Sequence, residues 1–148
     1  MLKITPFLWF DTQAGEAAKF YTSIFPNSKI LSTSLYEADT PSGLPKGSVM
    51  TVNFEINEQE FTALNGGPVF KFTEAVSFVV KCKDQDEIDY YWEKLSAVAE
   101  SEQCGWLKDK FGLSWQVIPE NLGDLIKDEK GMQKMLKMKK IVIKDFIS

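Results

Sequence analysis

The sequence predicts an α+β fold built from two copies of a strand–helix–strands unit, followed by a helical extension. The apolar positions of two amphipathic helix candidates repeat with an offset of 71 residues, as in the step from Ala17 to Ile88. The strand candidate before each helix repeats with the same offset, from Phe7 to Phe78. Two amphipathic helices can resemble each other by chance, but the matching strands favour a true repeat.

The first unit, residues 1–67, is expected to contain one helix and four strands. Apolar and polar side chains alternate along residues 50–56, which is typical of a half-buried strand. Asn57 and Glu58 form a turn candidate, and the residues Gly66-Gly67-Pro68 end the unit. The expected elements are a strand at 4–10, a helix at 14–25 and strands at 29–36, 50–56 and 59–65.

The second unit, residues 73–119, is expected to begin with a strand at 76–82 and a helix. Asp84 is a suitable N-cap for this helix, and Glu87 stands three residues later, so the two residues match a capping box. The unit closes with the stretch Cys104–Pro119, in which two apolar runs flank a polar break. This pattern predicts a strand, a turn and a second strand.

Within this closing stretch, Lys108–Lys110 form the polar break and Gly112 supplies the residue that most easily takes a positive φ. Alternation along the last strand places Trp115 and Val117 on one face and Gln116 on the other. Gln116 is therefore either a satisfied polar spectator at the edge of the core or part of a site.

The extension, residues 120–148, is expected to be helical. A short helix is predicted at 120–127, and Asp128 can cap a second helix that runs to Lys140. The inward side of the second helix is expected to carry Met132, Met135 and Leu136. The apolar residues near the end need a cover, either this core or a partner subunit, and they predict a homodimer: Ile141, Val142, Ile143, Phe146 and Ile147.

The composition limits the classes of function. The 148 residues fit a single domain, 1–148, and a net charge of −4 does not suit a nucleic-acid-binding protein. The chain has no histidine, which removes the commonest general base and transition-metal ligand. No transmembrane run or signal-peptide pattern is visible, so we expect no membrane partner. The two cysteines, Cys82 and Cys104, are expected to be reduced thiols in a cytoplasmic protein.

Several stretches together resemble the vicinal oxygen chelate superfamily, which includes the glyoxalase and bleomycin-resistance folds. The resemblance covers nearly the whole chain and is strongest to the PhnB-like branch, often labelled demethylubiquinone-methyltransferase-like. It implies two βαβββ units that form curved mixed sheets with helices on the outer face, plus a C-terminal helical extension. The stretches that carry it are residues 5–10 with 16–21, then 63–68, and then 104–116.

In metal-dependent members of this superfamily, four ligands come from the first and last strands of each unit. The resemblance places these positions at Pro6, at Ser77, at Gln116 and at Asn65 or Ala63. Proline has no donor side chain, and the other candidates are neutral and poor ligands for a divalent transition metal. The family label also suggests S-adenosylmethionine. The Gly66-Gly67 pair, however, lies between strands and not in a loop between a strand and a helix.

We therefore expect a glyoxalase-fold, PhnB-like protein that binds a small molecule in a cavity without a metal centre or other cofactor. The alternative is a metal-dependent glyoxalase- or dioxygenase-type enzyme with atypical ligands. Ser77 and Gln116 are expected either to orient the ligand or to be satisfied by water in a vestigial site. Cys104 is either a site residue or a small buried apolar side chain. The candidate ligand-binding residues are Leu8, Asn65, Ser77, Cys104, Trp106 and Gln116.

Overall fold

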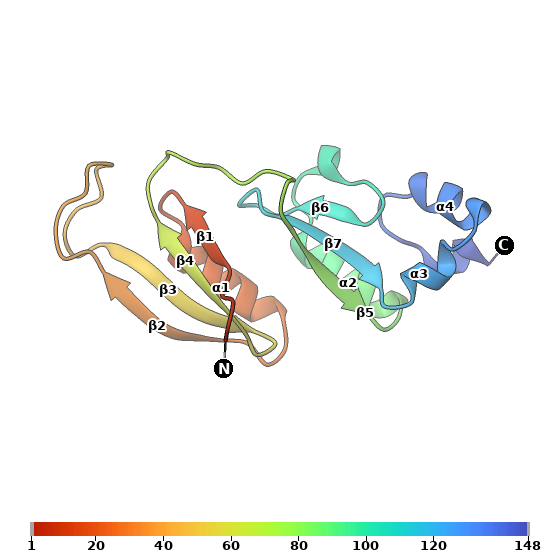
Figure 1. Ribbon diagram of the computed structural model, residues 1–148, viewed down its shortest axis with the longest axis horizontal. Coiled ribbons are helices and arrows are strands. Elements are labelled where there is room, and N and C mark those ends of the chain that lie inside the picture. The colour runs from red at the N-terminus through yellow and green to blue at the C-terminus, as the bar shows by residue number, and fades with distance from the viewer. Residues whose placement is uncertain (1, 148) are drawn as a thin grey trace. The chain divides into compact units, whose positions relative to one another are not determined.

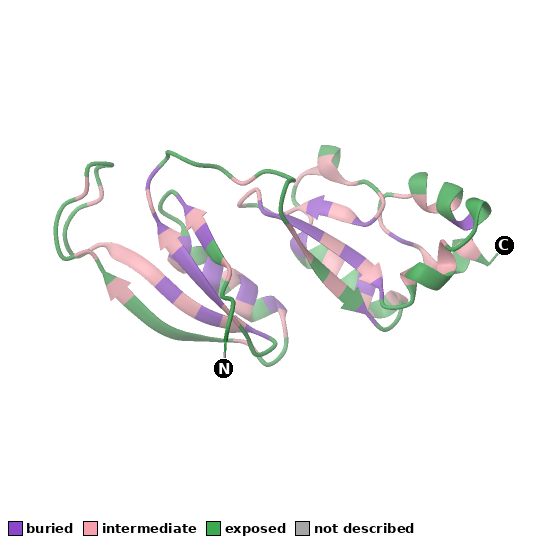
Figure 2. Cartoon of the chain, in the orientation of Figure 1, coloured by how far each residue is buried: buried purple, intermediate pink, exposed green. Residues whose placement is uncertain are grey.

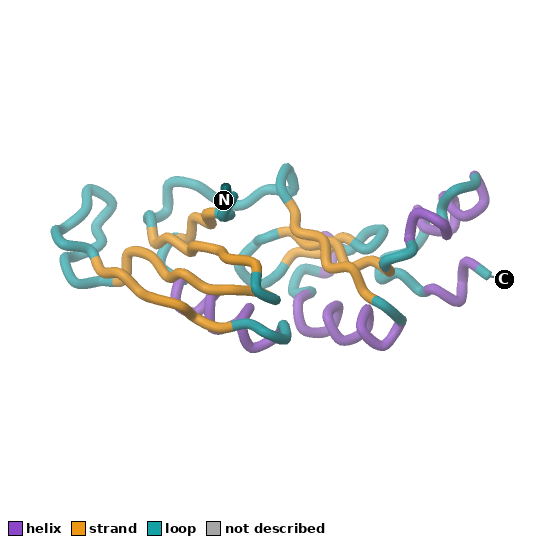
Figure 3. Tube along the Cα trace, turned by 60° about the horizontal axis from the view of Figure 1, so that its bottom comes forward, coloured by secondary structure: helices purple, strands orange, loops and turns teal. Residues whose placement is uncertain are grey.

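The computed structural model describes residues 2–147 and divides into two compact units, which meet in the sequence between Lys71 and Phe72 (Figure 1). Each unit has a mixed sheet with one long helix on one of its faces (Figure 3). The predicted α+β class and the repeated unit are confirmed. The two helices of the repeat, α1 (Ala14–Ile24) and α2 (Gln85–Leu95), begin and end 71 residues apart.

The first unit has the expected βαβββ order. Its sheet has the strand order β1-β4-β3-β2, in which β1 and β4 are parallel and the other pairs are antiparallel. Asn57 and Glu58 have φ values of 48° and 70° and form the predicted two-residue turn between the last two strands. The strands are β1 (Phe7–Phe10), β2 (Lys29–Leu35), β3 (Val49–Ile56) and β4 (Gln59–Asn65).

The core of the first unit lies between its sheet and α1. Buried and less buried residues alternate along the second half of β3 (Figure 2). The buried ones are Val52, Phe54 and Ile56. The ring of Phe54 stacks on Tyr21 of α1 at 6.2 Å and on Phe61 of β4 at 5.5 Å between centroids. The opposite face of this sheet carries no helix of the unit (Figure 3).

The second unit departs from the predicted βαβββ order, because it lacks one strand within the described residues. Its sheet has three strands in the order β5-β7-β6, and a 3-10 turn, η1 (Ala99–Ser101), follows α2 where the first unit has its second strand. The chain between helix and last strand is 18 residues long here and 34 in the first unit, which leaves too little length for another strand. The strands are β5 (Ser77–Cys82), β6 (Trp106–Lys108) and β7 (Ser114–Pro119).

Asp84 caps α2 as predicted, but the return bond of the capping box goes to Lys83 and not to Asp84. A carboxylate oxygen of Asp84 accepts a hydrogen bond from the backbone N–H of Glu87 at 3.0 Å. The Glu87 carboxylate in turn accepts one from the backbone N–H of Lys83 at 2.9 Å. The helix buries Ile88 and Leu95 against its sheet. These bonds fix the point at which the repeated helix begins.

The extension contains α3 (Leu122–Leu125), α4 (Glu129–Leu136) and η2 (Ile143–Phe146). Asp128 caps α4 as predicted, since it accepts a hydrogen bond from the N–H of Gly131 at 2.7 Å. The helix ends at Leu136 and not at Lys140.

The expectation that Met132 and Leu136 point inward is wrong, because they are 38% and 54% exposed. The buried residue of α4 is Gly131, where a Cβ atom would lie 2.1 Å from the carbonyl oxygen of Leu125. The helix therefore approaches its neighbour through a glycine, which leaves the methionine side partly exposed.

The residues after α4 form a tail that packs on the second unit. The side chain of Gln85 donates to the carbonyl of Ile141 at 2.9 Å and accepts from the N–H of Ile143 at 2.8 Å. The N–H groups of Cys104 and Gly105 donate to the carbonyls of Met138 and Lys139, both at 2.8 Å. Ile141 is fully buried. Within residues 2–147, no helix combines the length and the apolar character needed to cross a bilayer.

Candidate functional site

The sheet of the second unit presents a surface that its own helix does not cover. The register places Ser77, Ser114 and Lys108 in one row across the three strands, and Val79, Gln116 and Trp106 in the next row. Phe78 and Trp115 lie on the opposite face of this sheet, where their rings are 5.7 Å apart. We call the surface formed by these two rows the open face of the second unit.

Two of the predicted site residues meet on this open face. The side-chain amide of Gln116 donates a hydrogen bond to the hydroxyl oxygen of Ser77 at 3.0 Å. The bond fixes the orientation of both side chains. The hydroxyl proton of Ser77 and the amide oxygen of Gln116 are not used in this bond and can bind a ligand. Trp106 is the cross-strand neighbour of Gln116 and is half-buried. The pair and the indole together combine a polar anchor with a flat apolar wall.

The other row of the open face holds a polar group that sequence reasoning missed. Ser114 is 1% exposed, and its hydroxyl has no hydrogen-bond partner among residues 2–147. On one side it neighbours Ser77, and on the other side it neighbours Lys108. Lys108 forms an ion pair with Glu74, which precedes β5. Residues two apart in a strand share a face, so the position of Ser114 beside Gln116 could have been predicted from the sequence of β7.

The first unit has an uncovered sheet face of a different character. Its polar residues satisfy one another across the strands: Thr62 donates to Asn53 at 2.7 Å, and Asn53 donates to Ser32 at 2.9 Å. The same row ends on β1 at Phe7, which is 61% exposed. This face is therefore a polar ladder beside an exposed aromatic ring.

Leu8 and Asn65 do not lie on the uncovered face of the first unit. Leu8 is 7% exposed and pairs with Ala63 on the side that faces α1. The Asn65 amide oxygen accepts a hydrogen bond from the N–H of Ala14, the first residue of α1, at 2.8 Å. Its amide nitrogen donates to the carbonyl of Val49 at 3.1 Å. Asn65 thus fastens the start of α1 to the sheet.

Cys104 lies in a tight turn and not on the open face. Cys104 and Gly105 have φ values of 53° and 87°, as in a two-residue hairpin turn, and their N–H groups bind the tail. The amide of Gln103 lies 3.3 Å from the Cys104 sulfur. Both cysteines are free thiols, and burial raises the pKa of the Cys82 thiol to about 12. Cys82 is therefore an inert core residue at neutral pH.

The residues at the superfamily's metal positions do not fit a divalent transition metal. Pro6 has no donor side chain, and Asn65 uses both side-chain groups to bind backbone. Ser77 and Gln116 are neutral and bind each other. Among residues 2–147, no group of three or more His, Cys, Asp or Glu side chains is placed to hold a metal ion.

The glycine pair at the end of β4 does not form a cofactor loop. The indole nitrogen of Trp9 donates to the carbonyl of Gly67 at 2.9 Å. A Cβ atom at Gly66 would lie 2.4 Å from the Trp9 ring, so this glycine makes room for the indole. The pair precedes an irregular segment and not a helix. It therefore does not fit a glycine-rich S-adenosylmethionine loop.

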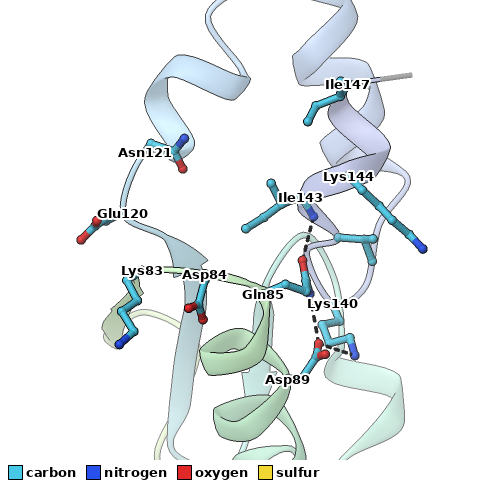
Figure 4. Close-up of a pocket in the computed structure, with 11 residues that line it drawn as sticks. Lys83, Asp84, Gln85, Asp89, Glu120, Asn121, Lys140, Ile143, Lys144 and Ile147 are labelled. Atoms are coloured by element: carbon cyan, nitrogen blue, oxygen red, sulfur yellow. Dashed lines mark hydrogen bonds and ion pairs between the residues drawn. The ribbon is translucent and has the colours of Figure 1, made fainter.

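A hollow of the second unit lies elsewhere, near the carboxyl end of β5 (Figure 4). It has a volume of about 760 Å³, and we call it the tail groove. Much of its charge is internally paired, since Lys140 binds Asp89 at 2.8 Å and Gln85 binds the tail. None of the predicted site residues lines it. Its lining includes Asp84, Gln85, Asp89, Lys140, Ile143 and Lys144.

Comparison with known proteins gives a consistent family. A family model described as 3-demethylubiquinone-9 3-methyltransferase matches residues 2–118. The solved structure of a PhnB protein from Bacillus cereus is 38% identical, with a TM-score of 0.65, and the match covers 79% of this chain and 99% of that protein. The curated proteins include no match.

More distant solved structures share the fold. A protein from Pseudomonas aeruginosa is 19% identical, with a TM-score of 0.60, over 80% of this chain and 98% of its own. The fosfomycin resistance protein FosX from Listeria monocytogenes is 16% identical, with a TM-score of 0.51, over 86% of this chain and all of its own. The chain therefore belongs to the family described as 3-demethylubiquinone-9 3-methyltransferase, the PhnB-like branch of the vicinal oxygen chelate superfamily.

Proposed function

We propose that this protein binds a small molecule on the open face of the second unit and does so without a metal centre. The observation that carries the proposal is the hydrogen bond between Gln116 and Ser77 beside the half-buried indole of Trp106. A fixed polar pair next to a flat apolar surface can orient a planar or amphipathic ligand. Leu8, Asn65 and Cys104 are not part of the proposed site, because each has a structural position of its own.

The absence of metal in this proposal rests on donor chemistry. The metal chemistry of glyoxalases and dioxygenases needs ligands that bind a divalent ion, and the side chains at the corresponding positions are neutral or already bound to backbone. A glycine-rich loop for S-adenosylmethionine is not supported either, because Gly66 packs against the Trp9 ring and Gly67 lies close to Ser42. Binding by hydrogen bonds and stacking needs neither of these groups.

A thermal-shift screen of hydrophobic metabolites and planar antibiotics, both neutral and acidic, run with and without chelator, tests this proposal. We expect at least one ligand to raise the melting temperature equally in both conditions, and Gln116→Leu to abolish the shift. Gln133→Leu is the matched control, because Gln133 is an exposed glutamine on α4 that binds Glu129. No binder in the screen would contradict the proposal. A stoichiometric divalent metal in protein purified without chelators would instead favour a metal-dependent enzyme.

We also propose that the protein is a cytoplasmic homodimer. The support for the dimer is exposed apolar surface, since Phe7, Val69 and Phe70 are each more than 60% exposed. The support for the compartment is that Cys82 and Cys104 are both free thiols. Light scattering of the full chain at micromolar concentration tests the assembly, and a monomeric mass would refute the dimer.

A further inference from the structure

The ion pair between Glu74 and Lys108 joins chain segments on the two sides of the central strand of the second unit. Lys108 lies on β6 opposite Ser114 of β7, and Ser77 lies opposite Ser114 on β5. Glu74 is three residues before Ser77, in the irregular segment that leads into β5. The ion pair therefore spans β7 close to Ser114.

The environment of Ser114 indicates a role in ligand binding and not a structural role. Its hydroxyl is buried and has no partner among the described residues, although a buried hydroxyl without a hydrogen bond costs free energy. Its neighbours in the row, the Ser77 hydroxyl and the Lys108 ammonium, are also donors. Three donors in one row form a surface that suits an anionic oxygen group.

In the structure, the negative charge beside Lys108 is the carboxylate of Glu74. The Glu74 side chain is 63% exposed, and its carboxylate binds Lys108 from a segment without regular structure. The hydrogen bond to Lys108 lowers the pKa of the Glu74 carboxyl, so this group stays charged at neutral pH. The Lys108 side chain is 28% exposed, and the open Glu74 side of the pair is screened by water, so the pair is weaker than a buried one. A ligand that also reaches the two hydroxyls can therefore replace it.

We propose that Ser77, Ser114 and Lys108 form an oxyanion subsite for a carboxylate, phosphate or phosphonate group of the ligand, and that Glu74 occupies this subsite until the ligand displaces it. This inference rests on the proposed function of the open face and specifies its ligand class. The apolar body of such a ligand would lie over the next row, where Trp106 is half-buried and Val79 is 46% exposed. The ligand is thus an amphipathic aromatic or aliphatic acid.

Calorimetric titration of the full chain with matched probes tests the subsite. Benzoate and phenylphosphonate supply the two kinds of oxyanion, and benzamide is the neutral analogue. We expect both anions to bind at least about tenfold more tightly than benzamide, because hydrogen bonds to charged groups are stronger than neutral ones. The better of the two anions then identifies the group that the subsite prefers.

Three variants separate this role from a structural one. Lys108→Met is expected to remove the preference for anions, and Glu74→Gln is expected to strengthen anion binding severalfold because the competing carboxylate is gone. Ser114→Ala is expected to weaken anion binding severalfold without lowering the stability of the free protein, since its hydroxyl has no partner to lose. Lys81→Met is the control, because Lys81 is an exposed lysine at the other end of the same face.

The outcomes distinguish this inference from the proposed function. If benzamide and the anions bind equally well and Gln116→Leu weakens both, the open face binds ligands but the oxyanion subsite is refuted. If Glu74→Gln leaves anion binding unchanged, the displacement by the ligand is refuted. If no probe binds, the oxyanion subsite is refuted, whereas the proposed function is tested separately by the wider thermal-shift screen. Circular dichroism of each variant confirms that the fold is retained.

Discussion

Asp109 offers a sharp test of how the open face is held in place. This aspartate is fully buried in the turn between β6 and β7, the strands that carry Lys108 and Ser114. One carboxylate oxygen accepts hydrogen bonds from the N–H groups of Phe111 and Leu113, at 2.8 and 3.0 Å. The other oxygen accepts one from the indole nitrogen of Trp115 at 2.9 Å. The side chain therefore ties the turn to the core and sets the register of the two strands.

The substitution Asp109→Asn keeps the shape of this side chain but turns one acceptor into a donor. Whichever way the amide is placed, an N–H group of the protein then faces the new NH2 group instead of an oxygen. A buried donor left without a partner costs about 1–3 kcal/mol, and the remaining bonds lose the contribution of the charge. We therefore expect the free energy of unfolding to fall by about 2–4 kcal/mol, which is a large part of the usual 5–15 kcal/mol.

Urea unfolding followed by circular dichroism measures this effect, with Trp115→Phe and the double variant completing a cycle. Phenylalanine has no indole N–H, so Asp109→Asn is expected to cost at least about 1 kcal/mol less in the Trp115→Phe background. If the asparagine variant is as stable as the wild type, or if the two substitutions are additive, the Asp109 carboxylate does not hold this turn to Trp115.

Three further predictions concern other elements. Ile141→Ala is expected to lower the free energy of unfolding in urea by about 2–5 kcal/mol, because Ile141 is fully buried. Ile147→Ala is the control and is expected to change it by no more than about 0.5 kcal/mol, because Ile147 is 79% exposed. Equal effects would show that the tail is not docked. Asn65→Ala is expected to cost about 1–3 kcal/mol, since the bonds to Ala14 and to the sheet are lost, and an unchanged thermal midpoint would contradict this role. Burial raises the pKa of the Cys82 thiol from 9.0 to about 12, so the thiol ionises in the unfolded chain before it does in the folded protein. The free energy of unfolding therefore falls as the pH rises from 9 toward 12. This fall is expected to be smaller in Cys82→Ala than in the wild type, and identical pH profiles would refute the contribution of Cys82.

The repeated unit could be predicted because its signals are local and periodic. Two helices with the same apolar positions, each preceded by a strand, require only the chain itself, and the structure places α1 and α2 at the predicted offset. The capping residue Asp84 is likewise recognisable from its neighbours. The missing strand of the second unit was not predicted, because strand count depends on the length between helix and hairpin and not on any single pattern.

Asn65 lies on the face of β4 that packs against α1, and not on the uncovered face of the sheet. The resemblance suggested a ligand position, but Phe61 and Ala63 are buried against α1, and Asn65 follows them at the same spacing of two. The alternation along β4 therefore already placed Asn65 on the face that packs against α1. Thr62 and Leu64 lie on the opposite, uncovered face. Asn65 caps α1, which lies about 50 residues earlier in the chain, and no local sequence pattern predicts such a long-range contact.

The tail could not be placed from sequence because its contacts are long-range. Gln85 binds both Ile141 and Ile143, and these partners are more than 50 residues away in the chain. The spacing of Met132 and Leu136 suggested an inward helix face, but close packing at Gly131 instead orients α4. Glycine contacts of this kind depend on tertiary structure and leave no hydrophobic signal.

We have proposed that a small molecule binds on the open face of the second unit by hydrogen bonds and stacking, without a metal. An NMR titration of the isotopically labelled full chain with the best ligand of the thermal-shift screen, in the presence of chelator, tests this binding residue by residue. We expect chemical-shift changes at Ser77, Trp106 and Gln116 that saturate at one ligand per chain. Changes confined to the tail groove, or binding that requires an added divalent metal, would contradict it.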